Sequence, residues 1–182
     1  HWLEFLNGNV EDGILTNYES KEGLNGLGDW VRPHPDAEPG KDVSMKDVFK
    51  CQETWGKESA LHFNNCFYAW NLQLVIQIAK ELGKYKDAEL FKERLSALKT
   101  NVHKKFFNPG KKVYLSTDQM RQVFSLFADI TPDSLQKDVL TSLFEDINGP
   151  HPYFNTGNST PLFINILSQM MDRNDLVLDI LL

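Results

Sequence analysis

Two kinds of amphipathic helix alternate along most of this chain. Residues 59–82 have apolar side chains on nearly every face, as expected for a helix that other helices surround. Residues 86–107 instead place their apolar side chains in one stripe at three- and four-residue spacing, with Lys and Glu on the opposite face. Two further pairs show the same contrast and span residues 117–129 with 131–147, and residues 160–172 with 175–182. The pattern predicts an all-α fold with about three helical hairpins.

Turn residues separate the predicted helices. Gly83 ends the first of them, and Thr131 supplies a capping hydroxyl ahead of Pro132 at the first position of a later one. Hairpins that lie side by side form either a solenoid or a closed double ring. The sequence has no strict repeat period, which disfavours a solenoid of regular repeats. A closed ring with the more apolar helices inside explains the two helix types better.

The segment from residue 11 to residue 58 lacks a helical period, and we expect it to be a long loop. Residues 1–10 before it have the pattern of the tail of a helix. Glycine and proline recur through the segment, which is far longer than an ordinary connection. Such a loop is generally functional or disordered. Aromatic side chains favour a packed, functional loop, and they are Tyr18, Trp30, Phe49 and Trp55.

Within this segment, Gly28-Asp29-Trp30 has the side chains that a protein needs to hold a sugar. The Asp29 carboxylate can accept hydrogen bonds from two hydroxyl groups. The Trp30 indole offers a flat apolar face to the C–H surface of a sugar ring. An Asp-Trp pair also occurs as a turn followed by a packing anchor in ordinary loops. On the tripeptide alone, both interpretations stay open.

The charge and hydropathy patterns argue against two classes of partner. The net charge is −6, from 19 basic and 25 acidic side chains, and no basic stripe appears. This argues against binding to nucleic acid or to an anionic membrane surface. The apolar runs are too short to cross a membrane.

Cys51 and Cys66 are the only cysteines in the sequence. They could pair as a disulfide in an oxidising compartment. However, Cys66 stands among Phe63, Phe67 and Trp70, which favours a small buried hydrophobic residue. Because neither cysteine has CxxC spacing or a paired histidine, we expect no metal site.

Nine short segments, taken in order, resemble the catalytic barrel of bacterial α-L-rhamnosidases, glycoside hydrolase family 78. They include Gly28-Asp29-Trp30 and an Asn-Thr-Gly segment similar to the family's His-Thr-Gly. The segments are residues 2–6, 12–15, 28–30, 65–68, 79–83, 87–88, 106–107, 155–157 and 161–163. They extend over nearly the whole chain.

The resemblance implies that residues 1–182 form a single partial domain, about half of an (α/α)6 six-hairpin barrel. It also implies inverting hydrolysis of terminal α-L-rhamnosides, which needs an acid and a base carboxyl group roughly 6.5–9.5 Å apart. In the family, the acid lies before Gly-Asp-Trp and the base lies beyond the last helix that this chain begins. We therefore assign no catalytic residue, and we expect no cofactor and no activity from the isolated chain.

The resemblance gives four candidate sugar-binding residues, namely Asp29, Trp30, Arg32 and Asn155. Asn155 stands where the family tends to have His, and residues 32–55 are longer and more charged than expected. An altered loop of this kind leaves room for a different sugar. Because Arg32 could form a bidentate pair with a carboxylate, an unsaturated uronide is one alternative substrate.

A non-catalytic helical module is a second alternative. Half of a barrel would leave apolar helix faces uncovered, and such faces favour self-association. The chain begins at His1 rather than Met and has no visible signal or transit peptide. We therefore expect the native N-terminus to be missing, which leaves periplasmic, extracellular and cytoplasmic bacterial locations open.

Overall fold

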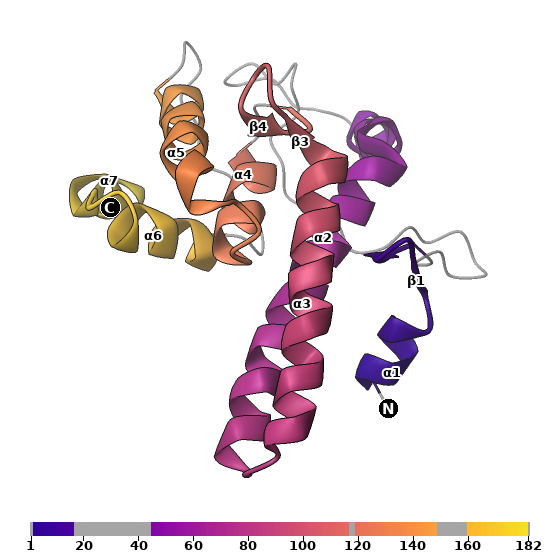
Figure 1. Cartoon of the computed structure of the whole chain (residues 1–182). Helices are drawn as coiled ribbons and strands as arrows, with labels where there is room; N and C mark the ends of the chain where they lie inside the picture. Colours follow the sequence, from indigo (N-terminus) through magenta and orange to yellow (C-terminus); the bar gives the residue numbers. More distant parts are fainter. Residues whose placement is uncertain (1, 17–44, 117–118, 149–159, 182) are drawn as a thin grey trace.

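The computed structural model describes residues 2–16, 45–116, 119–148 and 160–181, with the backbone alone for residues 45–57, 160, 163, 176 and 179–181. These ranges contain seven helices and two short β-hairpins (Figure 1). The helices are α1 (Trp2–Asn7), α2 (Met45–Glu81), α3 (Tyr85–Phe106), α4 (Gln119–Phe127), α5 (Asp133–Ile147), α6 (Thr160–Gln169) and α7 (Asn174–Leu181). The strands are β1 (Val10–Glu11), β2 (Ile14–Leu15), β3 (Phe107–Asn108) and β4 (Val113–Tyr114).

The helices pair as three consecutive hairpins, α2–α3, α4–α5 and α6–α7, which confirms the predicted organisation. Helix α2 contacts α4, and α4 contacts α6, so the first helices of the hairpins form one row. The α2–α3 turn lies at the lower end of Figure 1, and the β3–β4 hairpin lies at the upper end. None of the helices in the described ranges has the length and apolar character that a membrane crossing requires.

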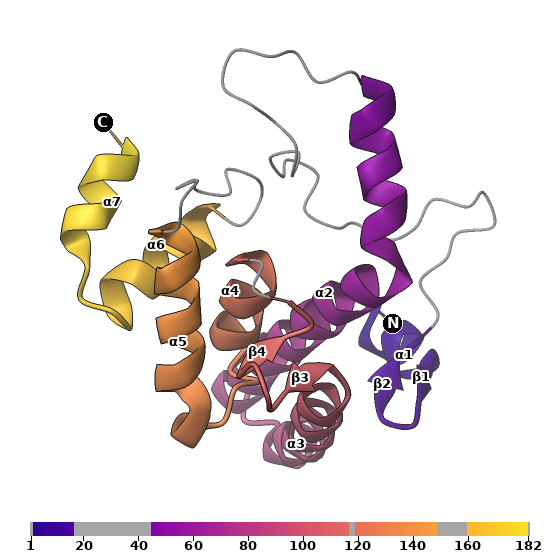
Figure 2. The same ribbon diagram turned by 90° about the horizontal axis from the view of Figure 1, so that it is seen from above.

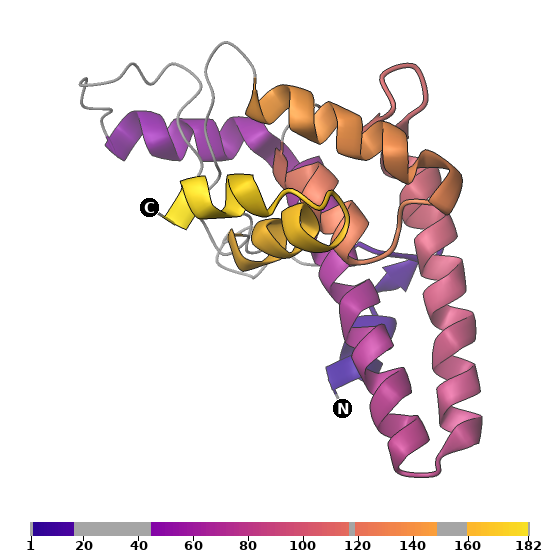
Figure 3. The same cartoon turned by 90° about the vertical axis from the view of Figure 1, so that its left-hand side faces the viewer.

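Helix α2 begins at Met45, so the expectation of a loop up to residue 58 was wrong for its last part. All the prolines of that segment precede Met45, and residues 45–58 hold polar residues that a helix accommodates. Gly56 suggested a loop, but one glycine inside a helix costs only about 1 kcal/mol. Helix α2 changes direction along its length, and its N-terminal part projects away from the other helices (Figures 2 and 3).

The other end of α2 follows the predicted turn. Gly83 has a φ of 69°, a left-handed conformation that glycine adopts without strain. The Gly83 amide donates to the Lys80 carbonyl over 2.9 Å, and the Lys84 amide donates to the Ala79 carbonyl over 2.8 Å. This Schellman pattern satisfies the last carbonyl groups of α2 and directs the chain back into α3.

The β1–β2 hairpin was not predicted as strands. Its two-residue loop is Asp12-Gly13, and both residues have positive φ values, 51° and 73°. Such a loop matches the twist of paired strands, and an Asp-Gly pair is its usual sequence. The turn packs closely on α3, because a Cβ atom at Gly13 would lie 2.0 Å from Nδ2 of Asn101.

A continuous apolar core joins α2, α3, α4, α5 and α6. The predicted stripe of α3 buries Ala88, Leu98, Val102 and Phe106, with Phe91 and Leu95 half-buried. Helix α5 similarly buries Val139, Leu143 and Ile147. Cys66 is 1% exposed and unpaired, as expected for a small buried residue.

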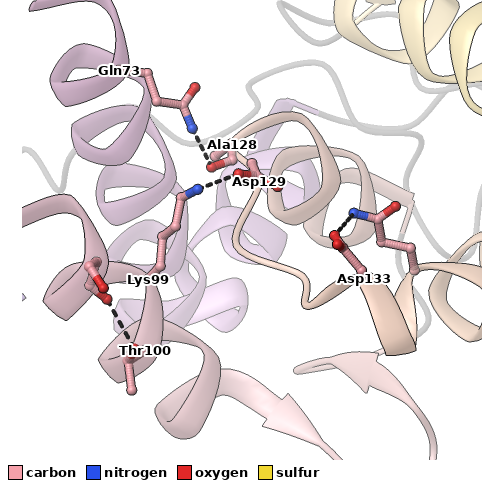
Figure 4. Close-up of polar contacts among 8 residues, drawn as sticks. Gln73, Lys99, Thr100, Ala128, Asp129 and Asp133 are labelled. Atoms are coloured by element: carbon pink, nitrogen blue, oxygen red, sulfur yellow. Dashed lines mark hydrogen bonds and ion pairs between the residues drawn. The ribbon is translucent and has the colours of Figure 1, made fainter. Parts of the chain in front are cut away.

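Polar contacts tie the first hairpin to the turn after α4 (Figure 4). Nε2 of Gln73 donates to the Ala128 carbonyl over 2.8 Å, and Lys99 forms an ion pair with Asp129. The start of α5 differs from the expected cap, because Pro132 rather than Thr131 occupies the N-cap position. Thr131 is buried, and no side-chain hydrogen bond caps the start of α5.

Leu72 and Leu74 offer a matched test of which face of α2 forms the core. Leu72 has no exposed surface, whereas Leu74 is 40% exposed. Leu72→Ala should lower the free energy of unfolding by about 2–5 kcal/mol, because it leaves a cavity in the core. Leu74→Ala should lower it by less than about 1 kcal/mol. Urea denaturation checks both, and equal losses would contradict the packing described.

Candidate functional site

The four predicted sugar-binding residues lie outside the described residues. Asp29, Trp30 and Arg32 precede α2, and Asn155 precedes α6. These assignments stay predictions. Helix α4 lies between these two helices, and its N-terminal turn begins at Gln119.

Arg121 stands in the first turn of α4 and links two other elements. Its Nε donates to Oγ of Ser59 in α2 over 3.0 Å, and Nη2 donates to the same oxygen. Its Nη1 donates to Oγ of Ser116, in the connection between β4 and α4. All three residues are half-buried. The planar guanidinium can hold both serines at once because its donors form a rigid fork.

Gln122 fastens the same connection from the buried side of α4. Its side chain has no exposed surface. Oε1 accepts the Tyr114 amide over 2.8 Å, while Nε2 donates to the Tyr114 carbonyl over 3.2 Å and to the Ser116 carbonyl over 2.6 Å. One amide side chain therefore satisfies three main-chain groups at the end of the β3–β4 hairpin, two of them buried and one partly buried.

Asn65 holds the β1–β2 hairpin in the same way, through hydrogen bonds from its side-chain amide to main-chain groups. Its Oδ1 accepts the Leu15 amide over 2.9 Å, and its Nδ2 donates to the Leu15 carbonyl over 3.0 Å. The same nitrogen donates to the Leu61 carbonyl one turn earlier in α2 over 2.8 Å. These bonds are buried, so they join β2 to the middle of α2 without access of water.

His62, Cys66 and Ser125 meet at the interface of α2 and α4. Nε2 of His62 lies 2.8 Å from Oγ of Ser125 and 3.6 Å from Sγ of Cys66. The His62 ring also packs edge-on to Phe106, with 5.3 Å between ring centroids. Burial, with a smaller contribution from the charge of Arg121, lowers the pKa of His62 to about 3. The imidazole is therefore neutral at physiological pH.

A cysteine beside a histidine can be a nucleophile, but this pair lacks the necessary ionisation. Burial raises the pKa of the Cys66 thiol, which disfavours the reactive thiolate. His62 and Cys66 are both about 1% exposed, so a substrate has no access to them. The cluster therefore packs α2 on α4 and carries no nucleophilic chemistry.

Tyr114, in β4, joins helix α3 to the polar groups at the end of the β3–β4 hairpin. Its hydroxyl lies 2.7 Å from Nδ1 of His103, and its side chain has no exposed surface. Burial raises the pKa of Tyr114 and lowers the pKa of His103. Both groups are therefore held in their neutral forms, which suits a hydrogen bond inside the core.

No Asp or Glu residue is fully buried among the described side chains, although Oδ2 of the half-buried Asp146 is covered. Nowhere in these ranges do three metal-ligating side chains converge. The buried amide side chains of the described residues join β2 to the middle of α2 and the end of β4 to α4.

Sequence reasoning missed these polar residues. Gln119, Gln122 and Ser125 recur every three residues on one face of α4 and are all buried. The sequence contains this spacing, but the helix was interpreted through its apolar residues alone. A polar stripe on an otherwise apolar helix indicates buried hydrogen bonds, because unpaired polar groups are costly inside a protein.

The buried imidazole predicts a loss of stability in acid. The pKa of His62 is lower in the folded chain than the ordinary value of 6.5, so its contribution is complete above pH 6.5 and falls as pH decreases towards 3. Relative to a His62→Gln variant, the wild-type chain should lose about 2 kcal/mol of unfolding free energy between pH 8 and pH 5. Urea denaturation at both pH values measures this difference. A pH-independent difference would show that His62 is not held neutral.

Comparison with known proteins places this helical framework in a family. The whole chain, residues 1–182, matches the family described as the bacterial alpha-L-rhamnosidase 6 hairpin glycosidase domain. An alpha-L-rhamnosidase of Alteromonas sp. (strain LOR) is 27% identical over 173 residues, which cover 91% of this chain and 18% of that protein.

Two solved structures have the same fold over nearly all of the chain. The alpha-L-rhamnosidase from Dictyoglumus thermophilum superposes with a TM-score of 0.69 at 24% identity, over 94% of this chain and 17% of that one. The Streptomyces avermitilis alpha-L-rhamnosidase complexed with L-rhamnose gives a TM-score of 0.66 at 20% identity, over 94% of this chain and 14% of that one.

The chain thus spans less than a fifth of the length of each of these relatives. The predicted all-α class, with hairpins of a partial six-hairpin barrel, is confirmed. The chain belongs to the bacterial α-L-rhamnosidase six-hairpin glycosidase domain family.

Proposed function

We propose that the protein containing this chain hydrolyses terminal α-L-rhamnosides with inversion at the anomeric carbon. The family match along the whole chain is the observation that carries this proposal. The relative from Alteromonas and the two solved relatives, all α-L-rhamnosidases, support it. Residues 1–182 would supply part of one barrel domain and contribute to binding of the carbohydrate.

Inverting hydrolysis would proceed in a single displacement. A carboxylic acid protonates the glycosidic oxygen while a carboxylate removes a proton from a water molecule on the opposite face of the sugar. The water oxygen bonds to the anomeric carbon as the glycosidic bond breaks, which converts an α-linked rhamnoside to β-L-rhamnose. We infer that both carboxyl groups lie outside this chain, so the chain alone would have no activity.

The role of this chain would be to bind and orient the sugar. Asp29 would accept hydrogen bonds from two hydroxyl groups, and Trp30 would stack on the ring. Asn155 would contribute an amide where the family tends to have an imidazole. In the sequence, Asp29 and Trp30 come before α2 and Asn155 comes before α6, and α4 contacts both of these helices.

Arg32 supports a second candidate substrate. A guanidinium binds a carboxylate through two parallel hydrogen bonds, so Arg32 would suit an unsaturated uronide better than a neutral deoxy sugar. Turnover of such a uronide, with none of rhamnosides, would favour this alternative. The non-catalytic module is the third candidate, and it predicts no turnover of either substrate.

Helix α2 carries an uncovered apolar stripe on the face opposite its core contacts. Leu74, Ile78 and Leu82 follow one another at four-residue spacing and are 40%, 55% and 65% exposed. Tyr85, at the start of α3, is 68% exposed. A stripe of this kind favours association with other apolar surfaces. We infer that the rest of the barrel covers it in the longer protein.

Activity of the longer protein tests the proposed reaction. A version extended in both directions should release the aryl group from an aryl α-L-rhamnoside, and proton NMR during turnover should show β-L-rhamnose first. Asp29→Ala and Trp30→Ala should each raise KM by about tenfold or more, because each loses a contact to the sugar. The control variant Leu90→Ala, at an exposed position on α3, should keep the wild-type KM. No turnover by the extended protein would refute the rhamnosidase proposal.

Association of the isolated chain tests the role of the stripe. Sedimentation should show assembly that grows with concentration, because the apolar side chains lack their cover. The double variant Ile78→Glu with Leu82→Glu should shift the population towards monomer. A wild-type chain that stays monomeric at every concentration, with a cooperative melt, would contradict the inference.

A further inference from the structure

The connection that follows β4 contains a strained turn. Leu115 has a φ of 58°, a left-handed conformation that a bulky side chain rarely adopts. The Ser116 amide donates to the Tyr114 carbonyl over 2.6 Å, so a hydrogen bond closes the turn over three residues. A three-residue turn whose central residue has a positive φ is the rare and strained form of the γ-turn. Leu115 therefore adopts a conformation that costs free energy.

Hydrogen bonds from one side chain hold this turn on both sides of Leu115. Oε1 of Gln122 accepts the Tyr114 amide, while Nε2 donates to the carbonyls of Tyr114 and Ser116. The amide of Leu115 itself donates to the Phe106 carbonyl over 2.9 Å. A strained residue persists only where its surroundings impose its conformation. The bonds of Gln122 impose it here, because they fix the peptide groups before and after Leu115.

Packing explains why the turn accommodates a leucine. The Leu115 side chain is half-buried and packs against the apolar core. These contacts offset part of the strain, because burial of an aliphatic side chain is favourable. A glycine at this position would lose the contacts and remove the strain, whereas an alanine would lose the contacts and keep the strain.

We propose that residues 114–116 form a hinge that the Gln122 side chain holds closed. When the Gln122 bonds break, Leu115 can leave the left-handed region, so the strain of the closed turn favours local opening. Helix α4 stays packed on α2 during this opening, because the edge-to-face contact of Phe63 with Phe124 does not involve the turn. The hinge therefore controls how the β3–β4 hairpin is attached to α4, which lies beside it (Figures 1 and 2).

The melting temperatures of two pairs of variants test the strain in the 182-residue chain. Leu115→Gly should melt about 2–4 °C above Leu115→Ala, because both lose the packing but only glycine removes the strain. Leu95 is the matched control, since it is half-buried against the same core on the right-handed helix α3. Leu95→Gly should melt about 2–4 °C below Leu95→Ala. A Leu115→Gly chain that melts at or below Leu115→Ala would overturn the proposal.

Hydrogen exchange in the wild-type chain tests whether the turn opens by itself. Urea added below the unfolding transition should hardly change the exchange rates of the Tyr114 and Ser116 amides, because local opening exposes little surface. The same urea should accelerate exchange of the Val123 and Phe124 amides, which lie in the core of α4 and need a larger opening. A parallel dependence on urea for all four amides would show that the turn opens only with the whole fold, and would overturn the hinge.

Gln122→Met tests the residue that holds the hinge closed. It keeps the size of the side chain but lacks the amide, so the Tyr114 and Ser116 amides should exchange at least about tenfold faster than in the wild type. Gln73→Met removes an amide bond to another turn, at the Ala128 carbonyl, and should leave both exchange rates unchanged. Unchanged exchange in Gln122→Met would overturn the role of Gln122. If this variant does not fold, the urea dependence of the wild-type chain still decides whether the hinge exists.

Discussion

Hydrogen bonds between side-chain amides and buried main chain hold the described fold around α2 and α4. Two short hairpins, β1–β2 and β3–β4, end inside the molecule, where each main-chain N–H and C=O group needs a partner. Asn65 supplies these partners to β2, and Gln122 supplies them to the end of β4. Apolar contacts alone would bring the helices together without specifying where the hairpins attach, so these amides determine how the elements at one end are arranged.

Periodic features were predictable from the sequence, and aperiodic ones were not. The stripe of α3 follows from spacing by three and four, because burying one helix face imposes that period. The start of α2 was not predicted, because residues 45–58 have no single apolar stripe and contain Gly56. The sequence predicts Thr131 as a helix cap because its hydroxyl can cap, but Thr131 is buried and Pro132 occupies the N-cap position.

The candidate site shows the same contrast between features that the sequence predicts and features that it does not. The candidate sugar-binding residues came from resemblance, because a carboxylate and an indole in a loop have no period that fixes their chemistry. The buried cluster of His62, Cys66 and Ser125 could be suspected from polar residues on apolar helices, but its inactivity depends on burial. The same three side chains at a solvent-exposed cleft would favour a thiolate. The packing of α2 on α4 therefore decides between a buried, neutral thiol and a reactive thiolate.

The hydrogen bonds of Asn65 and Gln122 to the two hairpins, which we call tethers, affect how the sequence of this domain can diverge. Asn65 and Gln122 bond to main-chain atoms of Leu15, Tyr114 and Ser116, and every residue except proline offers the same N–H and C=O groups. Substitution at a tethered position can therefore alter the side chain without breaking the tether. A framework anchored in this way tolerates wide sequence drift, which suits a fold retained at TM-scores of 0.66 to 0.69 with 20–24% identity.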